Sequence, residues 1–319
     1  MKFTELKKTL KTTIKNCYML KGDDEFLLTR SYELIRDALN IQVPELNLLI
    51  FKEDVDFDNV NKALETLPVF DTKKLVYVKL TSKDFKNEDK LNEYFNSINE
   101  SSVLVVSVGN TGYLKNMEKS FEIVDCNRLN TDFIFPFVVA ELKKSGKTIS
   151  KTACELLCEY SNCDLAKIIN ELAKLVSYVG DREVIQDDDI KLLVNKSVEF
   201  QIFELTEALA KKNEKKVYEI LETLKTKKDE YRGLIALIYK HFRRLFMVSI
   251  AGETKSELAK MLGVHEYAIT KSQEQAKLFT KKQLKEINDI CIQIDFDIKQ
   301  SNMTADNAIE YIVLKILNY

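Results

Sequence analysis

The first 130 residues alternate two kinds of segment, and this alternation restricts the possible folds more than any other feature of the chain. Short apolar runs rich in β-branched residues are separated by amphipathic stretches whose apolar residues recur at helical spacing. Such alternation is typical of an α/β domain with a parallel sheet, in which a helix follows each strand. Strands are predicted at residues 17–20, 46–51, 75–80, 103–108 and 121–124.

Three stretches between these strands place apolar residues on one helical face. Their members are Phe26, Leu27, Leu34, Ile35, Ala38 and Leu39; then Val60, Ala63, Leu64 and Leu67; then Leu91, Tyr94, Phe95 and Ile98. After about Thr131 the strand signal nearly disappears, and consecutive helices are predicted. Their ranges are 133–145, 150–160, 163–179, 187–193, 200–212, 214–225, 231–251, 256–262, 265–279, 280–299 and 305–317.

A chain of 319 residues exceeds what one hydrophobic core usually covers, so several domains are expected. We divide it into an α/β domain at 1–131, a small helical domain at 132–197 and a helical bundle at 198–319. With only 8 Gly and 3 Pro, the composition disfavours a turn-rich all-β architecture. The 48 Lys and Arg residues nearly balance the 50 Asp and Glu residues, so the overall charge does not favour binding to polyanions.

Sequence features bearing on localisation predict a cytoplasmic protein. The N-terminus, Met1-Lys2-Phe3-Thr4-Glu5, lacks the apolar region of a signal peptide. No apolar run is long enough to span a bilayer, and the six Cys residues suit a reducing compartment in which disulfides are not expected. No membrane association is therefore predicted.

The turn after the first predicted strand lacks the features of a nucleotide-phosphate site. Such a site needs Gly-rich backbone, a Lys and a Ser or Thr, whereas this turn has a single Gly22 followed by Asp23, Asp24 and Glu25. These carboxylates suit an ordinary capped helix start, and they would repel a phosphate. We expect a degenerate site that does not bind nucleotide, and hence no ATP hydrolysis by this chain.

Other chemical signatures are also weak. Cys154, Cys158 and Cys163 lie close in sequence, but they form no Cys-x-x-Cys pair, so buried packing is favoured over a metal site. No Gly-x-Ser-x-Gly motif or similarly placed nucleophile and His pair supports hydrolase chemistry, and no catalytic residue is expected.

The segment 255–269 has the form of a DNA-reading helix-turn-helix. Its second helix begins with His265, Glu266 and Tyr267, which suit packing better than base readout.

Several blocks of the sequence resemble the delta subunit family of the bacterial DNA polymerase III clamp loader, in the family's order and over nearly the whole chain. The first blocks are Tyr18-Met19-Leu20-Lys21-Gly22-Asp23-Asp24-Glu25-Phe26-Leu27-Leu28 and Glu65-Thr66-Leu67-Pro68-Val69-Phe70-Asp71-Thr72-Lys73-Lys74-Leu75-Val76-Tyr77-Val78. The later ones are Phe203-Glu204-Leu205-Thr206-Glu207-Ala208-Leu209, Arg232-Gly233-Leu234-Ile235-Ala236-Leu237-Ile238, Leu262-Gly263-Val264-His265-Glu266-Tyr267-Ala268 and Asp297-Ile298-Lys299.

The resemblance implies an AAA+-like (RecA-type) α/β domain, a helical lid domain and an all-α collar domain. It implies a subunit that binds and opens the beta sliding clamp for loading onto primed DNA without hydrolysing ATP. The implied partners are the tau/gamma ATPase subunits and delta-prime in a hetero-pentamer, with primer–template DNA bound in the complex. ATP would be bound by those partners, and no cofactor is expected in this chain. ATP binding by neighbouring subunits would expose the clamp-binding turn, and hydrolysis would release the clamp.

The family's clamp contact maps onto Leu67, Pro68, Val69 and Phe70. Apolar side chains on an exposed turn would enter a pocket of the clamp, and Pro68 would restrict the backbone. The family pattern commonly has a Gln near the start and a Leu before the Phe, where this chain has Glu65 or Thr66 and Val69. On periodicity alone, the alternative is that Leu67 completes a core-facing helix and Val69 and Phe70 pack under the sheet.

Two basic stretches suggest at most a weak contact with DNA phosphates inside the assembled loader. Residues 211–244 hold eleven Lys or Arg and five acidic residues, and Lys281 and Lys282 belong to a second cluster.

The nearest rival within the same class is a delta-prime-like scaffold subunit, which typically carries zinc-binding cysteines and a Ser-Arg-Cys finger. Arg128 stands instead in Asn127-Arg128-Leu129, and the sequence contains no Ser-Arg-Cys.

Overall fold

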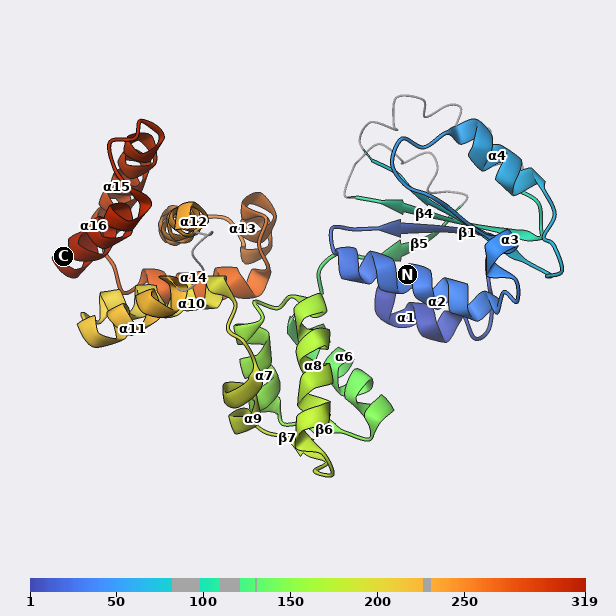
Figure 1. Ribbon diagram of the computed structural model, residues 1–319, viewed down its shortest axis with the longest axis horizontal. Helices are drawn as coiled ribbons and strands as arrows, with labels where there is room; N and C mark the ends of the chain where they lie inside the picture. Colours follow the sequence, from blue (N-terminus) through green and yellow to red (C-terminus); the bar gives the residue numbers. More distant parts are fainter. Residues whose placement is uncertain (82–97, 110–120, 130, 226–230) are drawn as a thin grey trace. The chain divides into compact units, whose positions relative to one another are not determined.

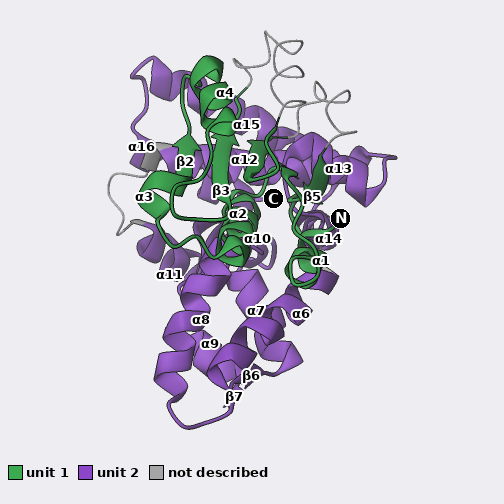
Figure 2. Ribbon diagram, turned by 90° about the vertical axis from the view of Figure 1, so that its right-hand side faces the viewer, with its two compact units in different colours: residues 1–129 green, residues 130–319 purple. Residues whose placement is uncertain are grey.

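The computed structural model describes residues 1–81, 98–109, 121–129, 131–225 and 231–319 (Figure 1). The chain forms two compact units, residues 1–129 and residues 130–319 (Figure 2). The further division of the second unit at residue 197 stays a prediction. The predicted helix that contains Leu91, Tyr94 and Phe95 lies outside the described residues.

The first unit is built on a five-stranded, fully parallel sheet with the strand order β2-β3-β4-β1-β5. The strands are β1 (Cys17–Lys21), β2 (Leu48–Phe51), β3 (Lys74–Lys79), β4 (Ser102–Val108) and β5 (Glu122–Asp125). The central strands are buried on both faces, as expected for a parallel sheet covered by helices. All five predicted strands are therefore confirmed, with bounds that shift by one or two residues.

Helices cover both faces of this sheet (Figure 1). On one face, α4 (Phe57–Glu65) buries Val60 and Leu64 against Val76 and Leu104. On the other face lie α1 (Phe3–Thr9) and α2 (Glu25–Leu39), and the Tyr32 ring of α2 meets the Tyr77 ring of β3 at 4.5 Å.

Two short helices of the first unit were not expected. The apolar face of α1 and its C-cap consists of Phe3, Leu6 and Leu10, all of them buried. These three residues at helical spacing are too short a pattern to predict a helix from sequence. The short helix α3 (Pro44–Asn47) occupies the start of the predicted strand 46–51, because Pro44 suits the first turn of a helix. The predicted strand is therefore wrong at residues 46–47.

The second unit is mainly helical. Its elements are α6 (Thr131–Leu142), η4 (Lys143–Ser145), α7 (Lys151–Tyr160), α8 (Leu165–Val179), α9 (Asp187–Leu193), α10 (Val198–Ala210), α11 (Glu214–Lys225), α12 (Tyr231–Ile250), α13 (Lys255–Leu262), α14 (Glu266–Ala276), α15 (Lys281–Lys299) and α16 (Ala305–Leu317). A parallel pair of two-residue strands, β6 (Thr148–Ile149) and β7 (Val184–Ile185), was not predicted. The main hydrophobic core of this unit joins α10, α11, α12, α15 and α16. Among the described helices, none combines the length and apolar character needed to cross a bilayer.

Candidate functional site

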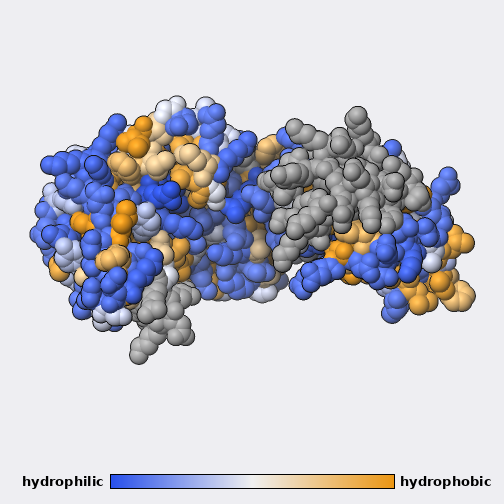
Figure 3. All heavy atoms as spheres, turned by 90° about the horizontal axis from the view of Figure 1, so that it is seen from above, coloured by the Kyte–Doolittle hydropathy of each residue, from blue (hydrophilic) through white to orange (hydrophobic). Residues whose placement is uncertain are grey.

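The turn that connects α4 to β3 carries three exposed apolar side chains. The exposed fractions are 68% for Leu67, 42% for Val69 and 89% for Phe70, and Pro68 between them is partly buried. Figure 3 shows hydrophobic atoms on the surface of the first unit, at the end where α3 lies in Figure 1. The alternative in which these side chains pack under the sheet is wrong. Exposed apolar side chains grouped on one turn are typical of a surface that binds a partner.

The backbone of this turn is fixed by the side chain of Asn47, which lies at the end of α3. Asn47 Oδ1 accepts a hydrogen bond from the N–H of Val69 at 2.8 Å, and Asn47 Nδ2 donates to the Val69 carbonyl at 2.8 Å. Asn47 Nδ2 also lies 2.8 Å from Asp71 Oδ2. The two oxygens of Asp71 accept the backbone N–H groups of Gln42 and Val43 at 3.0 Å each. These N–H donors, with a smaller contribution from Asn47, lower the pKa of the Asp71 carboxyl.

The other side of the turn is held by Lys74, a lysine that is only 1% exposed at the start of β3. Its Nζ donates to the Ala63 carbonyl and, at 2.6 Å, to Thr66 Oγ1. These acceptors belong to the last turn and the C-cap of α4, where a cation interacts favourably with the helix dipole. Burial lowers the pKa of the Lys74 ammonium group.

Phe70 lies in the left-handed backbone region, with φ at 56°. This conformation is uncommon for a bulky residue, and it persists only where the surrounding contacts determine the backbone. The bonds from Asn47 to Val69 and from Asp71 to residues 42 and 43 supply such contacts on either side of Phe70.

The acidic turn after β1 is a capped helix start, as the sequence predicts. Asp24 is the N-cap of α2 and accepts the N–H of Leu27 at 3.0 Å. Asp23 Oδ1 accepts the N–H of Arg128 at 3.3 Å, and Glu25 pairs with Lys79 of β3. The three carboxylates thus have partners within the first unit, at the position where a phosphate-binding loop would place N–H donors and a lysine.

Gly22 is required in this turn by a close approach of two backbone segments. A Cβ atom at this position would lie 2.1 Å from the carbonyl carbon of Cys126 and 2.5 Å from the backbone nitrogen of Asn127. The N–H of Asp24 donates to the Cys126 carbonyl at 3.2 Å, so the segment after β5 covers the turn. In this chain the glycine therefore serves backbone packing.

Two family models match the chain, one in each of its compact units. Residues 18–129 match the model of the DNA polymerase III delta subunit, and residues 199–316 match the model of the C-terminal domain of that subunit. The chain belongs to the DNA polymerase III delta subunit family. The match confirms the family that the sequence blocks suggest.

Individual relatives agree with the assignment to the delta subunit family. DNA polymerase III subunit delta of Bacillus subtilis (strain 168) is 27% identical and covers 99% of this chain and 97% of its own length. The subunit of that name from Buchnera aphidicola (subsp. Schizaphis graminum, strain Sg) is 23% identical over 84% of this chain and 81% of its own length. The solved Bacillus subtilis DNA clamp loader delta protein superposes with a TM-score of 0.77 at 27% identity, covering 99% of this chain and 100% of that one. The predicted α/β domain with a parallel sheet, followed by helical regions, is thereby confirmed.

The helix-turn-helix segment of this delta-family chain is occupied by internal contacts. His265 is buried as the N-cap of α14 and accepts the N–H of Tyr267 at 3.1 Å. The Tyr267 hydroxyl donates to Glu159 at 2.6 Å, and Ile269 is fully buried. The residues that would read bases thus pack within the second unit, which disfavours the regulator alternative.

The remaining predicted positions are placed as follows. Lys281 and Lys282 are exposed in the first turn of α15, and Lys282 Nζ lies 3.9 Å from Glu286 Oε1. Cys154, Cys158 and Cys163 are buried. The hydrogen bond with the Cys158 thiol, and then burial, raise the pKa of Cys154. Within the described part of the chain, no three His, Cys, Asp or Glu side chains are grouped as metal ligands.

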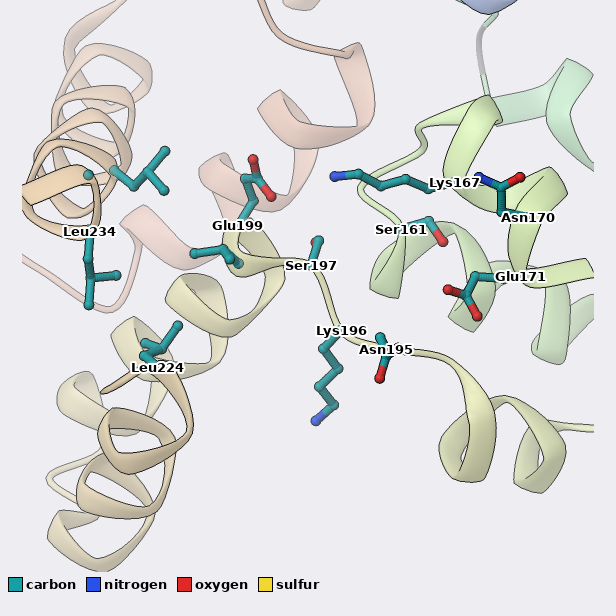
Figure 4. A pocket seen from close by; sticks show the side chains of 13 residues that line it. Ser161, Lys167, Asn170, Glu171, Asn195, Lys196, Ser197, Glu199, Leu224 and Leu234 are labelled. Carbon is teal, nitrogen blue, oxygen red and sulfur yellow. The ribbon is translucent and has the colours of Figure 1, made fainter. Parts of the chain in front are cut away.

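The second unit also contains a pocket of about 630 Å³ (Figure 4). Its lining includes Lys167 and Glu171 of α8 and the apolar Leu224 and Leu234 of α11 and α12. Lys196, another lining residue, is paired with both oxygens of Glu204 at 2.9 Å. The carboxylates of Glu171 and Glu199 also line this pocket, so its charge does not favour a phosphate group.

The sequence did not reveal the residues that fix the turn at residues 67–70, called here the clamp-contact turn after the role that the resemblance predicts for it. Asn47 fell within a predicted strand, and Asp71 and Lys74 lay in the block that resembles the family but were given no role of their own. Pro44 was the one available signal, because proline favours the first turn of a helix and α3 positions Asn47.

Proposed function

We propose that this chain is the clamp-binding and clamp-opening subunit of its DNA polymerase III clamp loader, and that the clamp-contact turn docks on the beta sliding clamp. The observation that carries this proposal is the exposure of Leu67, Val69 and Phe70 on a turn with a fixed backbone. Each such side chain contributes roughly 1.5–3 kcal/mol when fully buried by a partner.

The chain is proposed to act without catalysis or cofactor of its own. The acidic turn at Gly22, Asp23, Asp24 and Glu25 supports this, because its carboxylates cap α2, accept a backbone N–H or pair with Lys79. ATP would be bound by the tau/gamma subunits of the loader. Opening of the clamp is then limited by the difference in affinity for its open and closed states.

Assembly with the tau/gamma and delta-prime subunits is proposed to use residues 198–319 as a collar, after a lid at 132–197. The exposed apolar residues Ile292 and Phe296 of α15 and Tyr311 and Leu314 of α16 support a subunit contact. Each is at least 41% exposed on helices that pack against each other. Large apolar side chains in this number are more typical of interfaces than of free surfaces.

Contact with primer–template DNA is proposed as a further part of this function. It rests on the exposure of Lys281 and Lys282, which would neutralise phosphates without reading sequence. Charge reversal at both positions should lower the affinity of the assembled loader for primed DNA and reduce the salt slope. An unchanged affinity and slope would remove these lysines from the DNA-binding surface.

The experiment that tests the main proposal is binding of the purified chain to the sliding clamp of the same organism. We compare the natural chain with a folded Val69→Ala/Phe70→Ala variant. A loss of at least about tenfold in affinity, or 1.4 kcal/mol, would locate the contact at the clamp-contact turn. Absence of binding by the natural chain, alone and within the assembled loader, would refute the proposal.

A further inference from the structure

We propose that Asn47 is a positioning residue that holds the clamp-contact turn preformed, so that its apolar side chains face outward before the clamp arrives. This inference rests on the proposed clamp binding. It concerns a residue outside the turn, separated from Val69 by 22 positions in sequence.

The side-chain amide of Asn47 is buried, and both its oxygen and its nitrogen make hydrogen bonds. The side chain is 0% exposed, and Oδ1 accepts from the Val69 N–H at 2.8 Å. Nδ2 shares its two hydrogens among the carbonyls of Val43 at 3.1 Å and Val69 at 2.8 Å and the carboxylate of Asp71 at 2.8 Å. A buried amide with all its polar atoms satisfied rigidifies its surroundings, since any movement leaves unpaired groups.

Both hydrogen-bonding groups of the Val69 backbone are thereby taken up within the chain. Asp71 continues the same network by accepting the backbone N–H groups of Gln42 and Val43, and Lys74 anchors the α4 side of the turn. The turn is thus tied to α3 on one side and to α4 on the other. Its side chains take no part in these bonds, which leaves Leu67, Val69 and Phe70 free to enter a partner.

The energetic consequence concerns the ordering cost of binding. A loop that must be ordered on binding loses affinity, whereas a loop held in the bound form keeps it. The left-handed backbone of Phe70 is costly unless neighbouring bonds enforce it. Removing the Asn47 amide should therefore release the turn and weaken clamp binding, although Asn47 itself does not touch the clamp.

The test compares Asn47→Ala with Asn61→Ala in the full-length chain. Asn61 lies on α4 in the same unit and bonds to Glu65 at 2.8 Å, so its truncation removes the same chemical group without removing a bond to Val69 or Asp71. We measure affinity for the sliding clamp and, without clamp, hydrogen exchange of the Val69 N–H. Asn47→Ala should lower affinity about tenfold and speed exchange of that amide, and Asn61→Ala should change neither.

A double-mutant cycle with Leu67→Ala distinguishes an effect of Asn47 on the turn from a general effect on the stability of the fold. If Asn47 acts through the turn, its effect on affinity should shrink when Leu67 is already truncated. Additive effects of the two substitutions, or unchanged Val69 exchange in a folded Asn47→Ala chain, would overturn the inference.

Should Asn47→Ala not fold, Asp71→Asn is the milder variant, and its expected loss of affinity for the clamp is several-fold. If the natural chain does not bind the clamp, the proposed function fails, while the exchange measurement still tests whether Asn47 holds the turn.

Discussion

The hydroxyl of Tyr267 donates a 2.6 Å hydrogen bond to the carboxylate of Glu159, which lies 108 residues earlier in the chain. The same carboxylate pairs with Lys271 Nζ at 2.9 Å. Glu159 belongs to α7 and the two partners to α14, so a single partly buried carboxylate joins the early helices of the second unit to its later bundle. Hydrogen bonds to charged groups are stronger than neutral ones.

Tyr267→Phe is expected to destabilise the second unit by about 1–2 kcal/mol, because a hydrogen bond to a carboxylate is lost while the Lys271 pair remains. Thermal or urea unfolding measures the change. Tyr218→Phe is the matched control, since Tyr218 is 52% exposed on α11. Equal stability of the two variants would show that the bond between Tyr267 and Glu159 is not a stabilising link.

Gly22→Ala is expected to destabilise the first unit severely, by about 3 kcal/mol or more, because the added methyl would overlap the backbone at Cys126. Gly109→Ala is the control, since among the described residues no heavy atom beyond the chain neighbours lies within 4 Å of a Cβ placed there. The free energies of unfolding of both variants provide the measurement. A Gly22→Ala chain as stable as Gly109→Ala would contradict the close backbone approach in this turn.

His241 is expected to make the chain less stable in acid. Burial, and then the positive charge of Arg244, lower the pKa of His241 to about 3 from its ordinary value of 6.5, against the opposing effect of the hydrogen bond to Gln275 Oε1. In the unfolded chain the imidazole binds a proton near pH 6.5, whereas in the folded chain it stays neutral to about pH 3. The unfolded state therefore binds more protons across this window, and stability falls as the pH is lowered through it.

The measurement is the unfolding midpoint of the natural chain and of His241→Gln between about pH 7.5 and pH 4.5, where an unperturbed histidine titrates and His241 does not. The natural chain should lose more stability than the variant over this range. Neutral His241 makes two hydrogen bonds: Nε2 lies 2.7 Å from Gln275 Oε1, and Nδ1 lies 3.0 Å from Arg244 Nη2. Protonation of Nδ1 would remove the second bond, because this nitrogen could no longer accept from Arg244. Identical pH slopes would mean that His241 is not buried in its neutral form.

The sequence predicted the sheet well because buried parallel strands are continuous apolar runs that stand out between amphipathic helices. It missed α1, whose one short stretch of helical spacing is a weak signal, and the β6 and β7 pair, whose two-residue strands have no periodicity to detect. The acidic turn was predictable because capping is local chemistry between Asp24 and Leu27.

The clamp contact was predicted at residues 67–70 from the resemblance to the family, while periodicity alone favoured burial of Leu67, Val69 and Phe70. Their exposure depends on bonds between positions distant in sequence, such as Asn47 to Val69 and Lys74 to Ala63. Such tertiary hydrogen bonds leave no pattern in a single sequence. The predicted contact with DNA at Lys281 and Lys282 stays a prediction.

The most direct measurement of the central claim is calorimetric titration of the sliding clamp with Leu67→Ala and Leu192→Ala chains. Both leucines are 68% exposed, but Leu67 lies in the clamp-contact turn and Leu192 lies on α9. We predict that Leu67→Ala weakens binding about tenfold, roughly 1.4 kcal/mol, while Leu192→Ala binds like the natural chain. Equal affinities of the two variants, with the natural chain binding normally, would contradict the assignment of the clamp contact to this turn.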